Sequence, residues 1–576
     1  MRALMMGAAL AALAFSAMAD AKTLVVNANG FTLDSMGRLQ PFESLLISDE
    51  GRVERVIKRG DKPPAMSGPY TRLDAKGLTV LPGLIDAHGH VMGLGFQALT
   101  VDLSETKTLE EALGKVKAYA EANPRARWIL GRGWNQVTWG LGRFPTAAEL
   151  DTAYSEKPVL LERVDGHASW ANSAAIKIAG VTRATKDPAG GRIERDADGN
   201  PTGVFVDAAA NLITSKVPPA NPIEAERALG KALDQMASLG LTGVHDAGVD
   251  AETWTLYRRF GDEGRLTTRI YAMAGGMEQL EKIAPVRPTG WLYDDRLILR
   301  SVKLYSDGAL GSRGAFLKEP YSDDPENKGL RFLDDTRMRN WMSKAMMHGF
   351  QVNVHAIGDG ANAQVLDAYA DLIPAYGSAL RHRIEHAQVV DTADIPRFAQ
   401  LGIIASVQPT HATSDKAMAG DRVGEARLAG AYAWKTLLDS GARIAGGSDF
   451  PVEPANPFYG LHAAVTRQDR DGQPPEGWRV GEALTLTQAL AAFTTGAAYA
   501  GHAESLVGSL EPGKWADFIV IDHDIFKIAP GELWKVKVQE TWLAGKRVYL
   551  RGAPTAPEPA PDAEKPAEGA VETPTS

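Results

Sequence analysis

The sequence predicts an α/β protein built on a (β/α)8 barrel, with a small β domain formed by the two ends of the chain. In the middle of the chain, short apolar segments alternate with helical segments, which is typical of parallel βα units. At both ends, short β-type segments are separated by glycine and proline, which indicates a sheet. Polar residues follow many of the central strands, as expected of a barrel that gathers its functional groups at the carboxyl ends of its strands.

The β domain is expected to be a β-sandwich made of residues 20–81 and 505–551. Its predicted strands are residues 22–26, 43–48, 53–58, 78–81, 517–521, 536–543 and 546–550. We expect the barrel to occupy residues 82–504, with an insertion around residues 91–240.

The central strands and helices follow one another in the order that βα units require. The strand candidates are residues 80–86, 128–130, 159–163, 242–245, 269–273, 297–305, 351–355, 383–386, 403–407 and 443–446. The helical candidates are residues 109–122, 223–239, 336–348, 361–372 and 486–499. A barrel needs only eight strands, so we assign some candidates, including the segment around residues 190–206, to the insertion.

The composition is ordinary for a globular protein and excludes several kinds of function. Of the 576 residues, 44% are hydrophobic and 23% are charged. The formal net charge of −9 offers no basic surface for a polyanion, so we expect no nucleic-acid partner. The chain has no cysteine, which excludes disulfides, thiolate metal sites and cysteine nucleophiles. A metal would have to be held by histidine, carboxylate or a modified side chain.

The first residues have the features of a secretory signal peptide. Arg2 precedes an apolar run, and Ala-Met-Ala at residues 17–19 fits the pattern of a cleavage site before Asp20. This predicts export to the periplasm or the medium, without stable membrane insertion, because the apolar run is short for an uncleaved anchor. From residue 552 to 576 the chain is rich in proline, alanine and glutamate, which predicts a disordered tail.

The strongest local motif is PGLIDAHGH, residues 82–90, in which His88 and His90 end an apolar strand. Residues two apart in a strand point to the same side, so both imidazoles can bind one ion. A single His-x-His is weak evidence, because histidines are common both on surfaces and in protein cores.

Three further residues stand where other strands end: His355 after NV, His386 after RIE, and Asp449 in GGSDFP. Taken singly, each is more easily explained as a core histidine or a turn-capping aspartate. Four histidines and one aspartate at the same end of a barrel are better explained together, as the ligands of a metal.

The ordered motifs resemble the amidohydrolase superfamily. The segments PGLIDAHGH, VKLYSDGALGSRGA, NVHAIGDGAN, RIEHAQ, GGSDFPVEP and GSLEPGKWADFIVID are similar to its YtcJ-like branch, amidohydrolase family 3, which includes N-substituted formamide deformylases. The resemblance runs from about residue 22 to residue 550. It implies metal ligands on the first strand (His88 and His90), the fifth and sixth strands (His355 and His386) and the eighth strand (Asp449).

The resemblance also implies that Lys303, in VKLY, is carboxylated and bridges two metal ions. A carbamate is an anionic oxygen donor, which would supply the charge that two metals need. The alternative is a free ammonium paired with Asp307 or Asp246, and a mononuclear site stays open.

The predicted function is metal-dependent hydrolysis of an amide-type, non-peptide carbon–nitrogen bond in a small molecule. One or two Zn²⁺ ions, or another divalent metal, would lower the pKa of a water molecule and polarise the substrate carbonyl. Asp449 would act as general base and then as general acid. The alternatives are an ester, lactone or cyclic-amide hydrolase, and a catalytically silent, metal-bound solute-binding protein. A polysaccharide hydrolase would need two acids facing each other across a groove, which explains the histidines less well. The assembly is left open, with a homodimer as one option.

Two polar residues in family-like motifs are further catalytic candidates. His167, in RVDGH, and Arg313, in GSRG, could polarise a carbonyl or hold a carboxylate. His167 could equally fix its own loop. His245 and Asp246 could line the pocket or form a structural hydrogen-bonded pair, and we expect the second.

Aromatic side chains supply the candidates for substrate contact. Trp134 and Trp139 lie on one predicted loop and are expected to form an apolar wall of the pocket. The alternative is that the two indoles pack the insertion against the barrel. Tyr305 is a further candidate, on weaker grounds.

Overall fold

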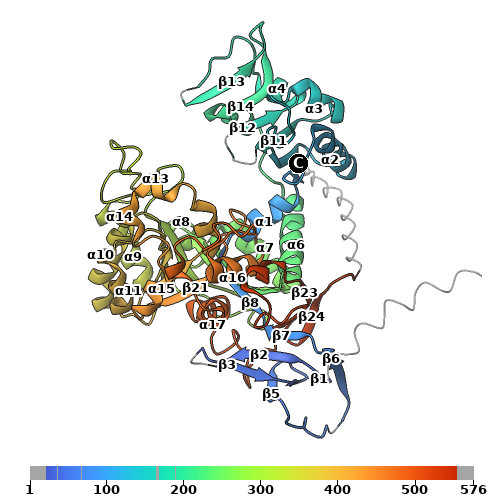
Figure 1. Ribbon diagram of the computed structural model, residues 1–576, viewed down its shortest axis with the longest axis vertical. Helices are drawn as coiled ribbons and strands as arrows, with labels where there is room; N and C mark the ends of the chain where they lie inside the picture. Colours follow the sequence, from blue (N-terminus) through green and yellow to red (C-terminus); the bar gives the residue numbers. More distant parts are fainter. Residues whose placement is uncertain are drawn as a thin grey trace, which may run out of the picture.

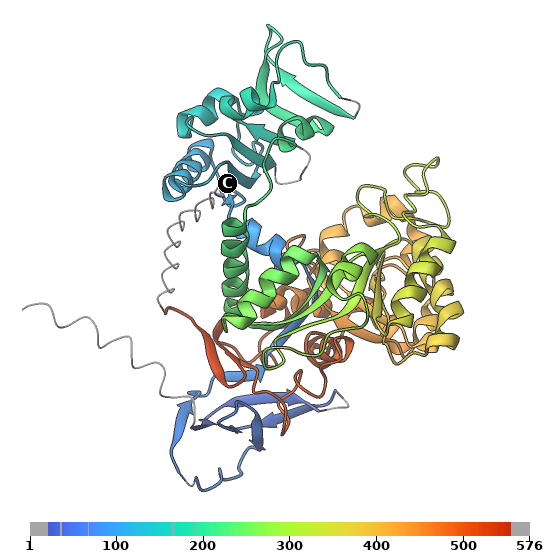
Figure 2. The same cartoon turned by 180° about the vertical axis from the view of Figure 1, so that it is seen from behind.

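The computed structural model describes residues 21–34, 37–66, 68–163, 166, 168–188 and 190–553. The predicted signal peptide, His167 and the predicted tail from residue 554 onward lie outside the described residues. Within the described part, the barrel lies between an inserted unit at one end of the molecule and a β domain at the other (Figure 1), and the opposite view gives the same order (Figure 2). None of the helices described is both long and apolar enough to cross a bilayer.

Eight parallel strands form the central barrel, which confirms the predicted fold class. They are β8 (Leu84–Gly89), β15 (Leu241–Val249), β16 (Arg269–Gly275), β17 (Leu297–Tyr305), β18 (Gln351–Ala356), β19 (Arg383–His386), β20 (Ile404–Val407) and β21 (Arg443–Gly446). Their neighbours in space are also their neighbours in sequence, as successive βα units require.

The first and last strands nearly close the barrel just beyond their ends. The Asp449 amide donates a hydrogen bond to the His88 carbonyl at 2.7 Å, and the His90 amide donates to the Phe450 carbonyl at 2.8 Å. The backbone that closes the barrel is therefore the same backbone that carries three of the predicted metal ligands.

Helices cover the outside of the barrel. They are α1 (Val91–Ala98), α6 (Pro222–Ser238), α7 (Ala251–Asp262), α8 (Met277–Ile283), α9 (Asp335–Met347), α10 (Asp359–Tyr376), α11 (Ile395–Leu401), α15 (Trp434–Asp439), α16 (Pro457–Thr466), α17 (Leu486–Ala491) and α18 (Ala497–Ala500). Short helices also lie on the loop after β20: α12 (Pro409–Asp415), α13 (Ala419–Val423) and α14 (Glu425–Leu428). The helix expected over 486–499 contains a π-helical turn, Ala492–Gly496, between α17 and α18.

The insertion is a separate α/β unit that leaves the barrel after α1 and returns at α6. It contains β9 (Val101–Asp102), α2 (Leu109–Ala122), β10 (Ile129–Trp134), α3 (Ala147–Ala153), β11 (Val159–Arg163), β12 (Ala168–Ala171), α4 (Ser173–Ala179), β13 (Gly191–Arg195), β14 (Pro201–Asp207) and α5 (Asn211–Thr214). Its sheet has the order β13-β14-β12-β11-β10-β9. The strand candidates at 128–130 and 159–163 belong to this sheet, and the remaining eight candidates supply the barrel.

The β domain joins both ends of the chain, as predicted. Its strands are β1 (Lys22–Val26), β2 (Asn29–Leu33), β3 (Leu39–Phe42), β4 (Ser44–Ile47), β5 (Val53–Ile57), β6 (Tyr70–Asp74), β7 (Thr79–Pro82), β22 (Phe518–Ile521), β23 (Val538–Leu543) and β24 (Lys546–Leu550). They form two sheets, β5-β4-β1-β6 and β24-β23-β22-β7-β2-β3, around one apolar cluster. A buried ion pair between Arg269 and Asp517, 2.7 Å long, ties this domain to the barrel.

Candidate functional site

His88 is the most constrained side chain at the carboxyl ends of the barrel strands. It is fully buried, and its Nδ1 donates a hydrogen bond to Glu385 Oε2 at 2.5 Å. This bond fixes the tautomer and turns the Nε2 lone pair towards the centre of the site. There Nε2 lies 3.5 Å from Asp449 Oδ1.

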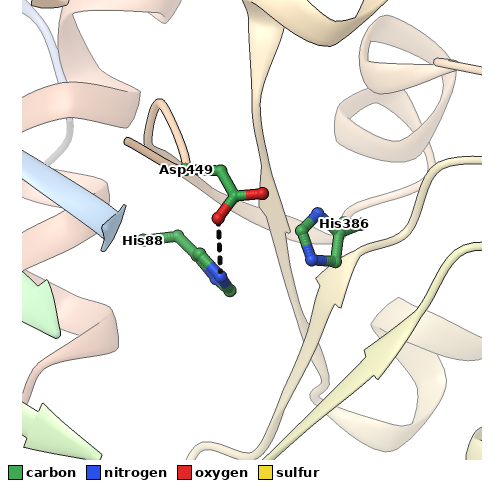
Figure 3. A group of neighbouring side chains, drawn as sticks. All are labelled: His88, His386 and Asp449. Carbon is green, nitrogen blue, oxygen red and sulfur yellow. Dashed lines mark ion pairs between the residues drawn. The ribbon is translucent and has the colours of Figure 1, made fainter. Parts of the chain in front are cut away.

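Asp449 lies between β21 and α16, and its backbone has a positive φ of 63°. Its Oδ1 is 3.1 Å from His90 Nε2. His90 itself is the N-cap residue of α1, directly after β8. Figure 3 shows the Asp449 carboxylate reaching towards His88, with His386 on its other side.

His386 and His355 come from neighbouring strands, and their rings are 4.5 Å apart. The His386 Nδ1 donates to Gln408 Oε1 at 2.9 Å, which leaves its Nε2 free to bind an ion. The His355 Nε2 is buried and makes no hydrogen bond among the described residues, although Asp307 Oδ1 lies 3.5 Å away. Such an orphaned nitrogen is costly unless something absent from the protein chain satisfies it.

Lys303 is buried beside these histidines, with 1% of its surface exposed. Its Nζ lies 3.4 Å from His88 Nε2 and 4.5 Å from the centre of the Tyr305 ring. Among the described residues, Lys303 forms no ion pair with Asp307 or Asp246, the two partners considered for a free ammonium. The Asp307 carboxylate accepts three backbone N–H groups, and the Asp246 carboxylate accepts from Tyr257 and the Val91 amide.

The residues that meet here fit a divalent metal. Ligand atoms of His88, His386 and Asp449 all lie within 4.8 Å of one another. Burial, with a smaller contribution from the Lys303 charge, lowers the pKa of His88 to about 4 and that of His355 to about 3. Both imidazoles are therefore neutral at neutral pH, as metal ligation requires. Nitrogen and carboxylate donors without any thiolate suit zinc and similar borderline ions.

The acidic groups of the site differ in the direction in which their pKa values are shifted. Burial by itself raises the pKa of Asp449, but the His90 hydrogen bond and nearby histidines hold it well below its usual range. For Glu385, the Arg383 guanidinium and His88 likewise outweigh burial and lower the pKa. Both side chains are thus carboxylates, and Asp449 is free to accept a proton. Burial instead raises the pKa of Asp86 to about 7.

Sequence reasoning placed Gln408 at a strand end but assigned no role to the residues that orient the ligands. Glu385 and Gln408 hold His88 and His386, and Asp86 accepts hydrogen bonds from the His88 amide and from the Ser448 hydroxyl. Their signal was present, since Asp86 and Glu385 lie inside the motifs PGLIDAHGH and RIEHAQ. His411 was also missed: its Nε2 lies 3.8 Å from Asp449 Oδ2, and its ring stacks on His386.

Arg313 does not present a free guanidinium to the site. Its Nε and Nη2 donate to the two oxygens of Asp323 at 3.1 and 3.0 Å. To polarise a substrate carbonyl or hold a substrate carboxylate, Arg313 would have to loosen this ion pair, and its catalytic role stays a prediction. The second catalytic candidate, His167, lies outside the described residues.

The two tryptophans predicted as a substrate wall lie instead in the core of the insertion. Trp134 has 0% and Trp139 has 9% of its surface exposed. The Trp134 indole donates to the Leu161 carbonyl and the Trp139 indole to the Thr106 hydroxyl, so both polar handles are used inside the unit. Both indoles therefore pack inside the insertion and not between the insertion and the barrel, and they leave little surface for a substrate.

Tyr305, the third candidate for substrate contact, does lie at the site. Its ring is 5.3 Å from that of His355, and 41% of its surface is exposed. His245 and Asp246, by contrast, do not bond to each other. His245 Nδ1 accepts from Arg383, and Asp246 accepts from Tyr257.

Comparison with known proteins agrees with this geometry. A sequence model of the amidohydrolase family matches residues 72–549. The putative amidohydrolase YtcJ of Bacillus subtilis is 34% identical over 532 residues, covering 87% of this chain and 98% of the relative. The N-substituted formamide deformylase of Arthrobacter pascens is 30% identical over 548 residues, covering 92% and 98%. The crystal structure of an uncharacterized metal-dependent hydrolase from Pyrococcus horikoshii superimposes with a TM-score of 0.71 at 28% identity, covering 89% and 99%.

Proposed function

Because the chain belongs to the amidohydrolase family and is a metal-dependent hydrolase, we propose that it cleaves an amide-type carbon–nitrogen bond outside peptides. The observation that carries the proposal is the meeting of neutral, buried histidines with one ionised aspartate at the ends of the barrel strands. The printed activity of the deformylase relative, which concerns N-substituted formamides, points to the same bond type.

In this proposal His88, His90, His355, His386 and Asp449 hold the metal, and zinc is the ion that fits their donor atoms best. When bound, zinc would lower the pKa of a water molecule and polarise the substrate carbonyl. Glu385 and Gln408 keep the ligating nitrogens of His88 and His386 turned inward.

Asp449 moves the proton. As a carboxylate it accepts a proton from the attacking water while the new carbon–oxygen bond forms. It then returns this proton to the leaving nitrogen as the carbon–nitrogen bond breaks, so the products are a carboxylic acid and an amine. Its position supports both steps, because Oδ1 lies near His88 and His90 while Oδ2 lies near His411 and away from these two ligands.

We also propose that Lys303 is carboxylated and bridges two metal ions. Two observations support this: the side chain is buried beside His88, and it has neither Asp307 nor Asp246 as an ion-pair partner. Carboxylation would replace a buried cation by an anionic oxygen ligand. Metal content measured with and without bicarbonate tests the idea, since a bridged site holds two ions per chain only when carbon dioxide is supplied. One ion per chain under both conditions would contradict it.

The bond type is tested by a substrate panel at saturating zinc. N-formyl amines, N-acyl amines, cyclic amides, lactones and simple esters are compared at equal concentration, with amine or acid release as the readout. We expect the open-chain amides to have the highest kcat/KM. Faster turnover of esters or lactones would move the chain to another leaving group. Metal-dependent binding without turnover of any compound would instead favour a solute-binding protein.

A further inference from the structure

Three large apolar side chains close in the backbone to the site are exposed, although such groups are usually buried. Tyr305, Phe332 and Val452 have 41%, 50% and 67% of their surface exposed. We call these three residues the apolar rim. Exposed apolar groups beside a few polar ligands are the usual composition of a small-molecule pocket.

The backbone places Tyr305 and Val452 near predicted ligands and Phe332 near Tyr305. Tyr305 is two residues beyond Lys303 on β17, so both side chains point to the same side of the strand. The Phe332 amide donates to the carbonyl of Ser306, the residue after Tyr305, at 2.8 Å. The Val452 amide donates to the Asp449 carbonyl at 2.9 Å.

The long loop beside the rim offers no uncommitted positive charge. Residues 306–334, all of them described, contain four cations: Arg313, Lys318, Lys328 and Arg331. Each is ion-paired, to Asp323, Asp391, Glu319 and Asp335 respectively. A substrate carboxylate on this side would have to compete with an acidic partner that each cation already has, whereas an apolar group could pack on the exposed side chains of the rim.

We propose that the site takes a neutral substrate whose apolar substituent packs against Tyr305, Phe332 and Val452. This inference rests on the proposed hydrolysis. The substrate class is therefore a neutral amide with an aryl or alkyl group, and amides of amino acids with a free carboxylate are disfavoured. Recognition comes from burial of apolar surface on the rim, while the scissile group is held at the metal cluster.

Four compounds separate the two features of this proposal. N-ethylacetamide has no large apolar group, and N-phenethylacetamide and N-ethyl-3-phenylpropanamide each add a phenyl group on one side of the amide. N-acetylphenylalanine keeps the phenyl group and adds a carboxylate. We expect the better neutral aryl amide to exceed N-ethylacetamide in kcat/KM by about 10- to 30-fold, from burial of the ring. It should exceed the acid by at least about tenfold, because a carboxylate would be desolvated without a partner.

Variants of the rim residues test whether the rim causes the preference for aryl amides. Tyr305→Ala, Phe332→Ala and Val452→Ser should each lower the ratio of kcat/KM for aryl amide over ethyl amide, by about tenfold for the largest effect. Val286→Ser and Met347→Ser are matched controls, because both side chains are exposed, by 69% and 63%, on segments that lead into the opposite ends of the strands. These controls should leave the ratio unchanged.

Calorimetry with the same four compounds and the zinc-loaded protein measures their affinities, which tests the role of the rim independently of turnover. If none is hydrolysed but the aryl amides bind more tightly and the rim variants abolish the difference, the proposed hydrolysis fails and the rim proposal stands. Equal kcat/KM and equal affinity for ethyl and aryl amides, or a preference for the acid, would overturn the rim proposal. So would a change from dimer to monomer in the rim variants, since the rim would then be a subunit interface.

Discussion

His88 Nδ1 and Glu385 Oε2 are 2.5 Å apart, and both side chains are completely buried. The same carboxylate pairs through its other oxygen with Arg383, at 2.8 Å. Glu385 therefore links the first predicted ligand to a buried cation that also donates to His245 and to the Ala87 carbonyl. The position of His88 depends on a residue that ligates nothing.

Weakening the hydrogen bond between His88 and Glu385 should lower metal affinity. Replacing Glu385 by Gln keeps the size of the side chain but removes the charge that orients and polarises His88. We expect zinc affinity to fall about 10- to 100-fold, measured by competition with a chromophoric chelator. Glu504→Gln is the control, because it breaks the Arg381–Glu504 ion pair far from the site. Equal zinc affinity in both variants would show that Glu385 only stabilises the fold.

Removing the proton acceptor should separate binding from chemistry. Asp449→Asn retains an oxygen donor but cannot accept a proton near neutral pH. We expect kcat on the preferred amide to fall about 10²- to 10⁴-fold, with a much smaller change in KM. Steady-state kinetics at saturating zinc provides the measurement, alongside metal analysis of the same samples. A variant that keeps wild-type kcat would assign proton transfer to another group, with His411 the nearest candidate.

Close packing behind the cluster predicts a sensitive glycine. A Cβ on Gly447 would lie 2.6 Å from the His88 amide nitrogen and 2.7 Å from Asp86 Oδ1. Since a backbone atom cannot move aside without shifting His88, Gly447→Ala should destabilise the fold by about 1–3 kcal/mol and reduce zinc content. Gly481→Ala is the control, because nothing lies within 4 Å of its Cβ position. Chemical denaturation and metal analysis give the two readouts, and equal stability of both variants would contradict the packing at Gly447.

Acid should destabilise the fold partly through His382, which lies outside the cluster. Burial lowers the pKa of His382 from 6.5 to about 3, and its Nδ1 accepts from the Val352 amide at 3.0 Å. Between these two pKa values the unfolded chain binds a proton that the folded chain does not. The stability that His382 contributes is therefore complete above pH 6.5 and is lost as the pH falls towards 3. The free energy of unfolding of His382→Asn should decline less steeply between pH 7 and pH 5, and parallel curves would refute this assignment.

The barrel could be predicted from the sequence because the patterns that indicate it are local. Alternating strands and helices, and polar residues at strand ends, predict eight βα units, and the eight strands at 84–89 through 443–446 have the expected order. Trp134 and Trp139 show the limit. A loop of two indoles after a strand has the same local pattern whether it lines a pocket or fills a core, and only the packing of the insertion decides between these.

The candidate site was likewise only partly predictable from the sequence. His88, His90, His355, His386, Lys303 and Asp449 could be proposed because each ends a strand within a recognisable motif. Glu385, Gln408 and Asp86 could not be assigned, because their roles depend on contacts across the barrel: Glu385 is 297 residues from His88 in the chain. The ion pair of Arg313 could not be predicted for a similar reason, since its partner Asp323 has no motif that marks it.

Zinc titration of the metal-free protein, with amide hydrolysis followed in the same samples, tests the central claim most directly. The account predicts no turnover without metal, a linear rise in rate with added zinc, and a plateau at one or two ions per chain. In His386→Asn, the rise should be lost at stoichiometric zinc. Full activity in the metal-free protein, or an unchanged titration in His386→Asn, would contradict the assignment of the catalytic metal to this cluster.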